Sequence, residues 1–106
     1  MKFICSVRNG EQSPEILDHI ERRMAQVSKL ERRKCTAQIV IDKQRHLHTV
    51  EIVLRGARVD MAAKGEVDDL YQSLDQAFNR LCRQLAKRRG KIRSSRHNRL
   101  EKRLRQ

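Results

Sequence analysis

The chain lacks a long hydrophobic run and an even set of cysteines, and we expect no secretory leader in its first residues. Its longest uninterrupted apolar stretch is only a few residues, which is too short to span a membrane. The opening segment, MKFICSVRNG, contains no apolar core of the length that a signal peptide needs. Cys5, Cys35 and Cys82 are odd in number and far apart, which argues against a disulfide framework or a paired-cysteine zinc site. We therefore expect a reduced, cytoplasmic protein.

Motifs for catalysis and metal binding are also scarce. No glycine-rich phosphate loop occurs, and His46 and His48 offer two metal ligands without an obvious third. Cys82 borders a predicted apolar stripe, so we interpret it as a core residue rather than a nucleophile. Charge compensation at the start of a helix accounts for most of the carboxylates that catalysis could use, which are Glu66, Asp68, Asp69 and Asp75. We expect no enzyme, no cofactor and no metal.

Acidic residues are almost missing from one end of the chain. The net charge is +12 over 106 residues, a length that suits one domain. Residues 79–106 contain twelve Lys or Arg and one acid, whereas residues 1–78 contain thirteen Lys or Arg and twelve acids. A nearly neutral body with one cationic end indicates a polyanionic partner. Nucleic acid is the first candidate, and an anionic membrane surface is the second.

The first third of the chain predicts a strand followed by a helix. Apolar and polar residues alternate over residues 2–8, as in a half-buried strand. Ser13 is the expected N-cap of the helix, with Pro14 at its first position. Apolar residues then follow helical spacing to about residue 30, namely Ile16, Leu17, Ile20, Met24, Val27 and Leu30.

The middle of the chain predicts three more strands and the start of a second helix. The alternating segments are residues 35–42, 48–55 and 58–64, with the polar loop KQRHL between the first two. Their short connections favour an antiparallel meander. The last helix is expected to begin near Glu66 or Val67. The order β-α-β-β-β-α predicts an α+β, two-layer fold with two helices on one face of a four-stranded sheet, similar to a double-stranded-RNA-binding domain.

The last helix is predicted to have two opposite faces. Its apolar stripe consists of Leu70, Leu74, Phe78, Leu81 and Leu85. On a helical wheel, four cations fall within about 80° of one another on the other side, and we call them the ridge: Arg80, Arg83, Lys87 and Lys91. Surfaces built for solubility usually mix both signs, because like charges three or four residues apart repel each other. The ridge therefore favours a bound anion over a merely solvated face.

Aromatic residues are too few to provide a platform for bases. Phe3 and Phe78 are in phase with the predicted core, and Tyr71 borders the apolar stripe. Modules that read single-stranded RNA stack bases on exposed aromatic rings. The remaining mode is contact with the phosphates and riboses of folded RNA, read largely by shape. The membrane alternative is weakened as well, because no Trp or Phe borders the basic face.

The segment DDLYQSLDQAFNRLCRQLAKRRGKI resembles the signature of the ribosome hibernation factors. This family contains the short hibernation-promoting factors and ribosome-associated inhibitors, also labelled ribosomal subunit interface or sigma-54 modulation proteins. The residues that carry the resemblance are Asp69, Leu70, Tyr71, Leu74, Asp75, Arg80, Leu81, Arg83, Gln84, Leu85 and Lys87. The similarity extends over residues 1–93 in element order. The chain departs from the family pattern at Val7, Leu70, Gln72 and Ser73, where glycine, methionine and small residues are frequent.

The resemblance implies binding to the small ribosomal subunit, in the channel for mRNA and tRNA, with steric inhibition of translation during stationary phase or stress. The rRNA contacts that it implies are Arg80, Arg83, Lys87, Arg88 and Lys91, then Arg22 and Lys29 in the first helix, and Lys43 and Arg45 in the first hairpin loop. Its implied partners are 16S rRNA, the 70S ribosome and, if ribosomes pair, a separate ribosome modulation factor. We expect a monomer off the ribosome.

Two further interpretations stay open at this point. A general structured-RNA-binding or ribosome-assembly protein would bind free folded RNA about as well as ribosomes. A protein-interaction regulator, as the sigma-54 label suggests, would bind its partner even at high salt. We expect residues 1–93 to form the ribosome-binding domain and residues 94–106 to form a basic tail, which could extend the helix, run along the mRNA path or order only on binding.

Overall fold

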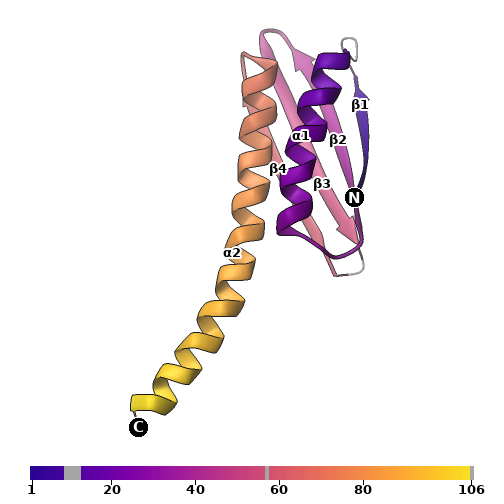
Figure 1. The fold of residues 1–106 in the computed structure, drawn as a ribbon. Helices are drawn as coiled ribbons and strands as arrows, with labels where there is room; N and C mark the ends of the chain where they lie inside the picture. Colours follow the sequence, from indigo (N-terminus) through magenta and orange to yellow (C-terminus); the bar gives the residue numbers. More distant parts are fainter. Residues whose placement is uncertain (9–12, 57, 106) are drawn as a thin grey trace.

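The computed structural model describes residues 1–8, 13–56 and 58–105, and the side chains of these residues as far as residue 88. The elements follow the predicted order β-α-β-β-β-α (Figure 1). Their bounds are β1 Lys2–Val7, α1 Pro14–Leu30, β2 Cys35–Gln44, β3 Leu47–Gly56, β4 Asp60–Val67 and α2 Leu70–Arg105. The strands form one sheet in the order β1-β2-β3-β4, in which β1 is parallel to β2 and the other pairs are antiparallel. The predicted α+β fold and its meander are confirmed.

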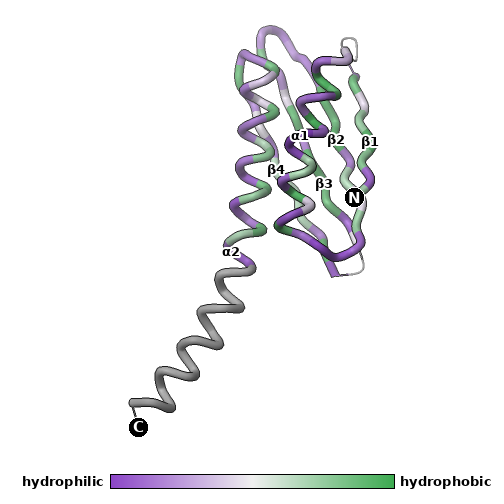
Figure 2. Tube along the Cα trace, viewed as in Figure 1, coloured by the Kyte–Doolittle hydropathy of each residue, from purple (hydrophilic) through white to green (hydrophobic). Residues whose placement is uncertain are grey.

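Both helices cover the same face of the sheet, and the core lies between the two layers (Figure 1). Helix α1 begins as predicted: Ser13 Oγ accepts a hydrogen bond from the Ile16 N–H at 3.3 Å, and Pro14 occupies the first turn. Its buried residues recur at helical spacing, whereas β2 buries every second residue over most of its length. Figure 2 shows how hydrophobic and hydrophilic residues alternate along these elements. The other face of the sheet is uncovered, and Ile4 is 60% exposed there.

Helix α2 begins later than the sequence pattern predicted. Its first residue is Leu70, whereas Glu66 and Val67 still belong to β4. Asp69 is the N-cap, because its Oδ1 accepts from the Gln72 N–H at 3.0 Å and its carbonyl accepts from the Ser73 N–H at 2.9 Å. The expected start was wrong because the strand continues past Gly65. Glycine has no side chain, so the alternation of apolar and polar residues is hidden at this position.

The first hairpin is tighter than predicted. Residues 43 and 44 extend β2 and Leu47 begins β3, so the segment KQRHL is mostly strand rather than loop. Only Arg45 and His46 form the turn. Arg45 has a φ of 58°, which is the left-handed conformation that two-residue hairpin turns require. Strand extension was missed because polar side chains are normal at the exposed end of a hairpin.

A close approach between backbones joins α2 to β4. A Cβ added to Gly65 would fall on the carbonyl oxygen of Ser73 and close to the backbone nitrogen of Ala77. The fully buried Ser73 hydroxyl accepts from the Val67 N–H at 3.1 Å and lies 2.8 Å from the carbonyl oxygens of His48 and Asp69, to which it can donate. These contacts fix the position of α2 across the sheet.

The backbone of α2 continues as helix to Arg105, beyond the end of the sheet (Figure 1). This segment includes residues 94–105 of the predicted tail, for which helix extension was one of the three expected outcomes. The boundary between residues 93 and 94 stays a prediction. Within the described part of the chain, no helix is long and apolar enough to cross a membrane.

Replacing Gly65 with alanine should destabilise the fold. The added methyl group must displace the backbone of α2, so we expect a loss of about 1–3 kcal/mol in the free energy of unfolding, measured with urea. Lys64→Ala, at an exposed position of the same strand, is the control and should change stability by less than about 0.5 kcal/mol. Because alanine is otherwise preferred to glycine within a strand, a stabilised Gly65→Ala variant would contradict the close approach.

Candidate nucleic-acid interface

Helix α2 separates its apolar and cationic residues as the sequence predicted. Leu74, Phe78, Leu81 and Leu85 are buried in the core. Arg83 and Lys87 are exposed, and neither side chain makes a hydrogen bond or ion pair to another described residue. We call them the exposed pair. Lys91 lies beyond the described side chains, so its place on this surface stays a prediction.

A second row of α2 residues covers the free edge of the sheet. We call Gln76, Arg80, Gln84 and Arg88, which recur every four residues, the edge ladder. The Glu66 N–H donates to Gln76 Oε1 at 2.8 Å, and Arg80 Nη1 donates to the Lys64 carbonyl at 2.6 Å. Gln84 Nε2 donates to the Ala62 carbonyl and Arg88 Nη2 to the Arg58 carbonyl, both at 3.1 Å. The ladder thus satisfies backbone groups that an edge strand otherwise leaves unpaired.

The predicted contacts on α2 therefore divide into two kinds. Arg80 donates to the edge of β4 and Arg88 to the loop that precedes it, and these hydrogen bonds fix the two guanidinium groups in position. Each guanidinium has five N–H donors, so some remain for an anion. Arg83 and Lys87 have no structural task among the described residues. The sequence did not reveal the ladder, because its four-residue spacing also suits a solvent-exposed row.

The opposite flank of α2 packs against α1 through polar side chains. His19 Nε2 lies 2.7 Å from Asp75 Oδ1, and the ring of His19 meets that of Tyr71 edge to face at 5.3 Å. Arg23 donates to Asn79 Oδ1 and lies over the ring of Phe78, 5.6 Å from its centre. The partners of Asp75 thus lie at the contact between α1 and α2. Tyr71 is 41% exposed, more than its place beside the apolar stripe suggested.

The predicted contacts on α1 lie on a mixed surface. Arg22 and Lys29 are exposed as expected. However, Asp18 and Glu21 border Arg22, and Arg22 Nε approaches the Asp18 carbonyl at 3.5 Å. The helix contains three acids and three cations, so it lacks a run of one charge sign such as α2 has between Asp75 and Glu101.

The hairpin cations are remote from the exposed pair. Lys43 is the last residue but one of β2, its N–H donates to Asp42 Oδ1 at 2.8 Å, and Arg45 lies in the turn that follows Gln44. This hairpin lies at the end of the body where α2 begins (Figure 1). Lys87 is 17 residues further along α2, or about 26 Å at the rise of a helix. The structure therefore does not bring all predicted contacts onto one surface.

The residues considered for metal binding or catalysis lie where structural roles account for them. No group of three metal-ligating side chains occurs in the described residues, His46 and His48 included. Cys82 packs against the core, and burial raises the pKa of its thiol, which opposes formation of a nucleophilic thiolate. Asp69 is the N-cap of α2, and Glu66 Oε2 lies 3.9 Å from Lys64 Nζ.

One buried carboxylate was missed by the sequence analysis. Glu31 is 6% exposed, and Arg33 donates to it from its backbone N–H, Nε and Nη2 at 2.9, 2.9 and 3.1 Å. These hydrogen bonds lower the pKa of the Glu31 carboxyl below its ordinary value, against the opposing effect of burial. The Arg58 carbonyl accepts from both Arg33 Nη1 and Arg88 Nη2, at 3.3 and 3.1 Å. An acid followed two residues later by arginine was the only signal available.

Comparison with known proteins identifies the family. The family model described as sigma 54 modulation protein / S30EA ribosomal protein matches residues 3–93, and the protein belongs to this family. The resemblance found in the last helix is thereby confirmed. No curated protein sequence matches the chain significantly.

Two solved structures share the fold. The N-terminal domain of Protein Y from Thermus thermophilus has a TM-score of 0.74 and 24% identity, covering 82% of this chain and 98% of that one. A ribosomal subunit interface protein from Coxiella burnetii has a TM-score of 0.70 and 19% identity, covering 85% of this chain and 99% of that one. At these identities the similarity establishes the fold.

Replacing Glu31 with glutamine should lower the melting temperature at pH 7 by a few degrees, because the Arg33 hydrogen bonds lose their ionic partner. A lowered pKa in the folded state means that the wild-type contribution is present above the unfolded-state pKa of about 4.3 and is lost as the pH falls through the folded-state value. The melting temperatures of wild type and variant should therefore converge as the pH falls from neutral through the folded-state pKa of Glu31. Glu21→Gln, on the exposed face of α1, is the control. A difference that stays constant with pH would contradict this account.

Proposed function

We propose that the protein binds 16S rRNA in the mRNA channel of the small ribosomal subunit and inhibits translation as a hibernation factor. Membership of the S30EA ribosomal protein family supports this proposal. The observation that carries it is the exposed pair, Arg83 and Lys87, two cations without a described partner on a helix whose other face is buried.

The chemistry of this surface suits phosphate rather than bases. The arginine guanidinium can donate two parallel hydrogen bonds to one phosphate, and lysine adds a flexible point charge. Tyr71 and Ile4 are exposed, but no row of aromatic side chains occurs in the described residues to stack successive bases. Folded RNA, recognised by the positions of its phosphates, is therefore the expected ligand.

Inhibition needs no catalytic group in this proposal. A rigid domain held in the channel by phosphate contacts excludes mRNA and tRNA by its volume. Such a protein acts in the cytoplasm, where ribosomes are stored in an inactive state. Because each phosphate contact releases counterions, binding should weaken steeply with salt, by roughly three orders of magnitude for about six contacts between low and moderate salt.

Charge reversal of the exposed pair tests the proposal. We expect Arg83→Glu with Lys87→Glu to weaken binding to purified small subunits on the order of a hundredfold, measured by sedimentation through sucrose at low salt. Neither side chain contacts the core, so the variant should melt within a few degrees of wild type. The matched control reverses Arg8 and Lys64, two exposed cations away from the pair, and changes the net charge equally. Because Lys64 lies beside Glu51 and Glu66, the melting temperature of the control is measured as well.

Four outcomes would contradict the proposal. Wild-type protein that stays at the top of a low-salt gradient does not bind ribosomes. Equal affinity for a free folded RNA indicates a general RNA-binding protein. Binding that survives high salt, or a pair variant that binds as well as the control, indicates contacts that do not depend on phosphate.

A further inference from the structure

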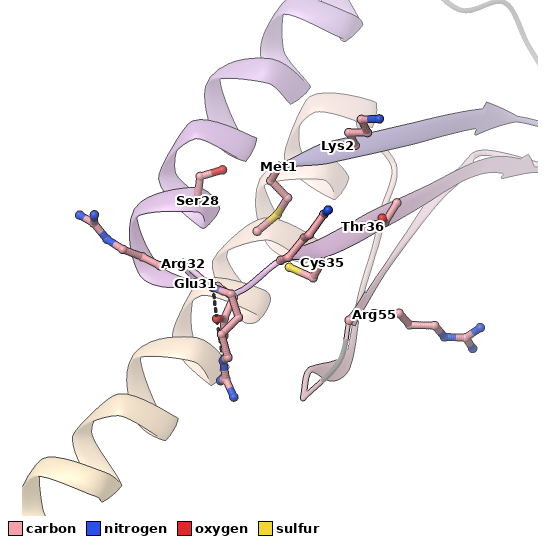
Figure 3. Close-up of a pocket in the computed structure, with 11 residues that line it drawn as sticks. Met1, Lys2, Ser28, Glu31, Arg32, Cys35, Thr36 and Arg55 are labelled. Atoms are coloured by element: carbon pink, nitrogen blue, oxygen red, sulfur yellow. Dashed lines mark hydrogen bonds and ion pairs between the residues drawn. The ribbon is translucent and has the colours of Figure 1, made fainter.

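A second group of cations surrounds a hollow at the end of the body where α1 ends and β2 begins. The hollow has a volume of about 760 Å³ and is lined by residues from the chain start, the 31–34 loop and the end of β3 (Figure 3). Four exposed cations among its lining residues form what we call the end cluster: Lys2, Arg32, Lys34 and Arg55. The predicted rRNA contacts include none of them.

Among the residues that line the hollow, no acid is free to neutralise these cations. Glu31 is the one carboxylate that lines it, and this carboxylate is already engaged by Arg33. Among the described residues, the side chains of Arg32, Lys34 and Arg55 make no hydrogen bond or ion pair. A concave surface lined by one sign of charge concentrates the electrostatic field and attracts anions.

The loop that bears Arg32 and Lys34 is held in place. The Glu31 N–H donates to the Val27 carbonyl at 2.8 Å at the end of α1, and the Glu31 carboxylate accepts from the Arg33 N–H. A Cβ on Gly56 would collide with the Lys34 carbonyl, so the end of β3 lies directly against the loop. The cations therefore sit on ordered backbone, which reduces the entropy lost when an anion binds.

The end cluster adjoins the cationic face of α2. The Arg58 carbonyl accepts from Arg33 of the loop and from Arg88 of the edge ladder, so the two elements meet at one atom. Helix α2 leaves the body at this same end (Figure 1). A ligand lying along α2 would therefore pass the hollow.

The orientation of the side chains favours a strand over a small anion. Arg32 and Arg55 extend outward on opposite sides of the hollow (Figure 3). One small anion in the hollow would not contact both guanidinium groups. A strand carries phosphates along its length and can meet each cation with a different one.

We infer that the end cluster is a second phosphate-binding surface, which contacts the backbone of the same RNA that the exposed pair binds. This inference rests on the proposed function and adds a second docking surface to it. Two separated surfaces fix the orientation of a domain on folded RNA, whereas a single surface leaves rotation free.

Reversal of Arg32 and Lys34 to glutamate tests the inference. Arg55 is left intact because its register partner on β4 is the acidic residue Asp60. Affinity for purified small subunits is measured at four salt concentrations for wild type, this variant, the exposed-pair variant and the control with Arg8 and Lys64 reversed. We expect the Arg32 and Lys34 variant to bind at least tenfold more weakly than the control at low salt. The slope of log K against the logarithm of the salt concentration should be smaller in magnitude than that of the control by about 1.5. If the glutamate variant does not fold, the double variant Arg32→Gln with Lys34→Gln replaces it in the same measurements.

The outcomes separate this inference from the proposed function. If the wild-type protein does not bind small subunits, both the proposed function and this inference are wrong. Wild-type binding with an end-cluster variant that matches the control in affinity and slope overturns the inference and leaves the exposed pair in place. Tight binding of tripolyphosphate to the free protein, lost in the variant while ribosome binding is unchanged, also overturns it, because the hollow would then be a site for small anions.

Discussion

The contact between α2 and β4 is the constraint on which the rest of the molecule depends. At Gly65 the two backbones approach too closely for any side chain, and Ser73 joins them through buried hydrogen bonds. With the helix fixed at this distance, its apolar stripe fills the core and the edge ladder reaches the free edge of β4. The same placement leaves the exposed pair facing away from the sheet. Packing thus sets the direction in which the cations point.

Much of the fold was predictable because the spacing of apolar residues along the sequence indicates which face of a helix or strand is buried. The caps and spacing of α1 and the alternation of β2 and β3 predicted those elements correctly. The start of α2 was missed because Gly65 continues the strand pattern without a side chain to show it, and Asp69 rather than Glu66 caps the helix. Exposure of Arg83 and Lys87 followed from the helical wheel. The edge ladder and the Glu31–Arg33 pair could not follow from it, since both depend on which strand or loop lies beside the helix.

Electrostatics separates the body into surfaces with different tasks. Helix α1 mixes acids and cations, and its contacts to α2 engage His19 and Arg23. Arg80 and Arg88 complete the sheet edge, so removing either would disturb the fold as well as any ligand. Among the described residues, Arg83 and Lys87 on α2 and Arg32 and Lys34 beside the hollow are cations whose side chains have no partner. Under the proposed function, a phosphate backbone would relieve the repulsion within these groups by supplying one anion for each cation.

The central claim is that the outer face of α2, and not the middle of the uncovered face of the sheet, lies against 16S rRNA. Photo-crosslinking tests it most directly, with a benzophenone amino acid placed either at Ala86, exposed on α2 beside the exposed pair, or at Gln38, exposed on the sheet. Neither substitution removes a charge. After irradiation of the complex with small subunits, we expect crosslinks to 16S rRNA from position 86 and none from position 38. Crosslinks from position 38, with none from position 86, would contradict the account.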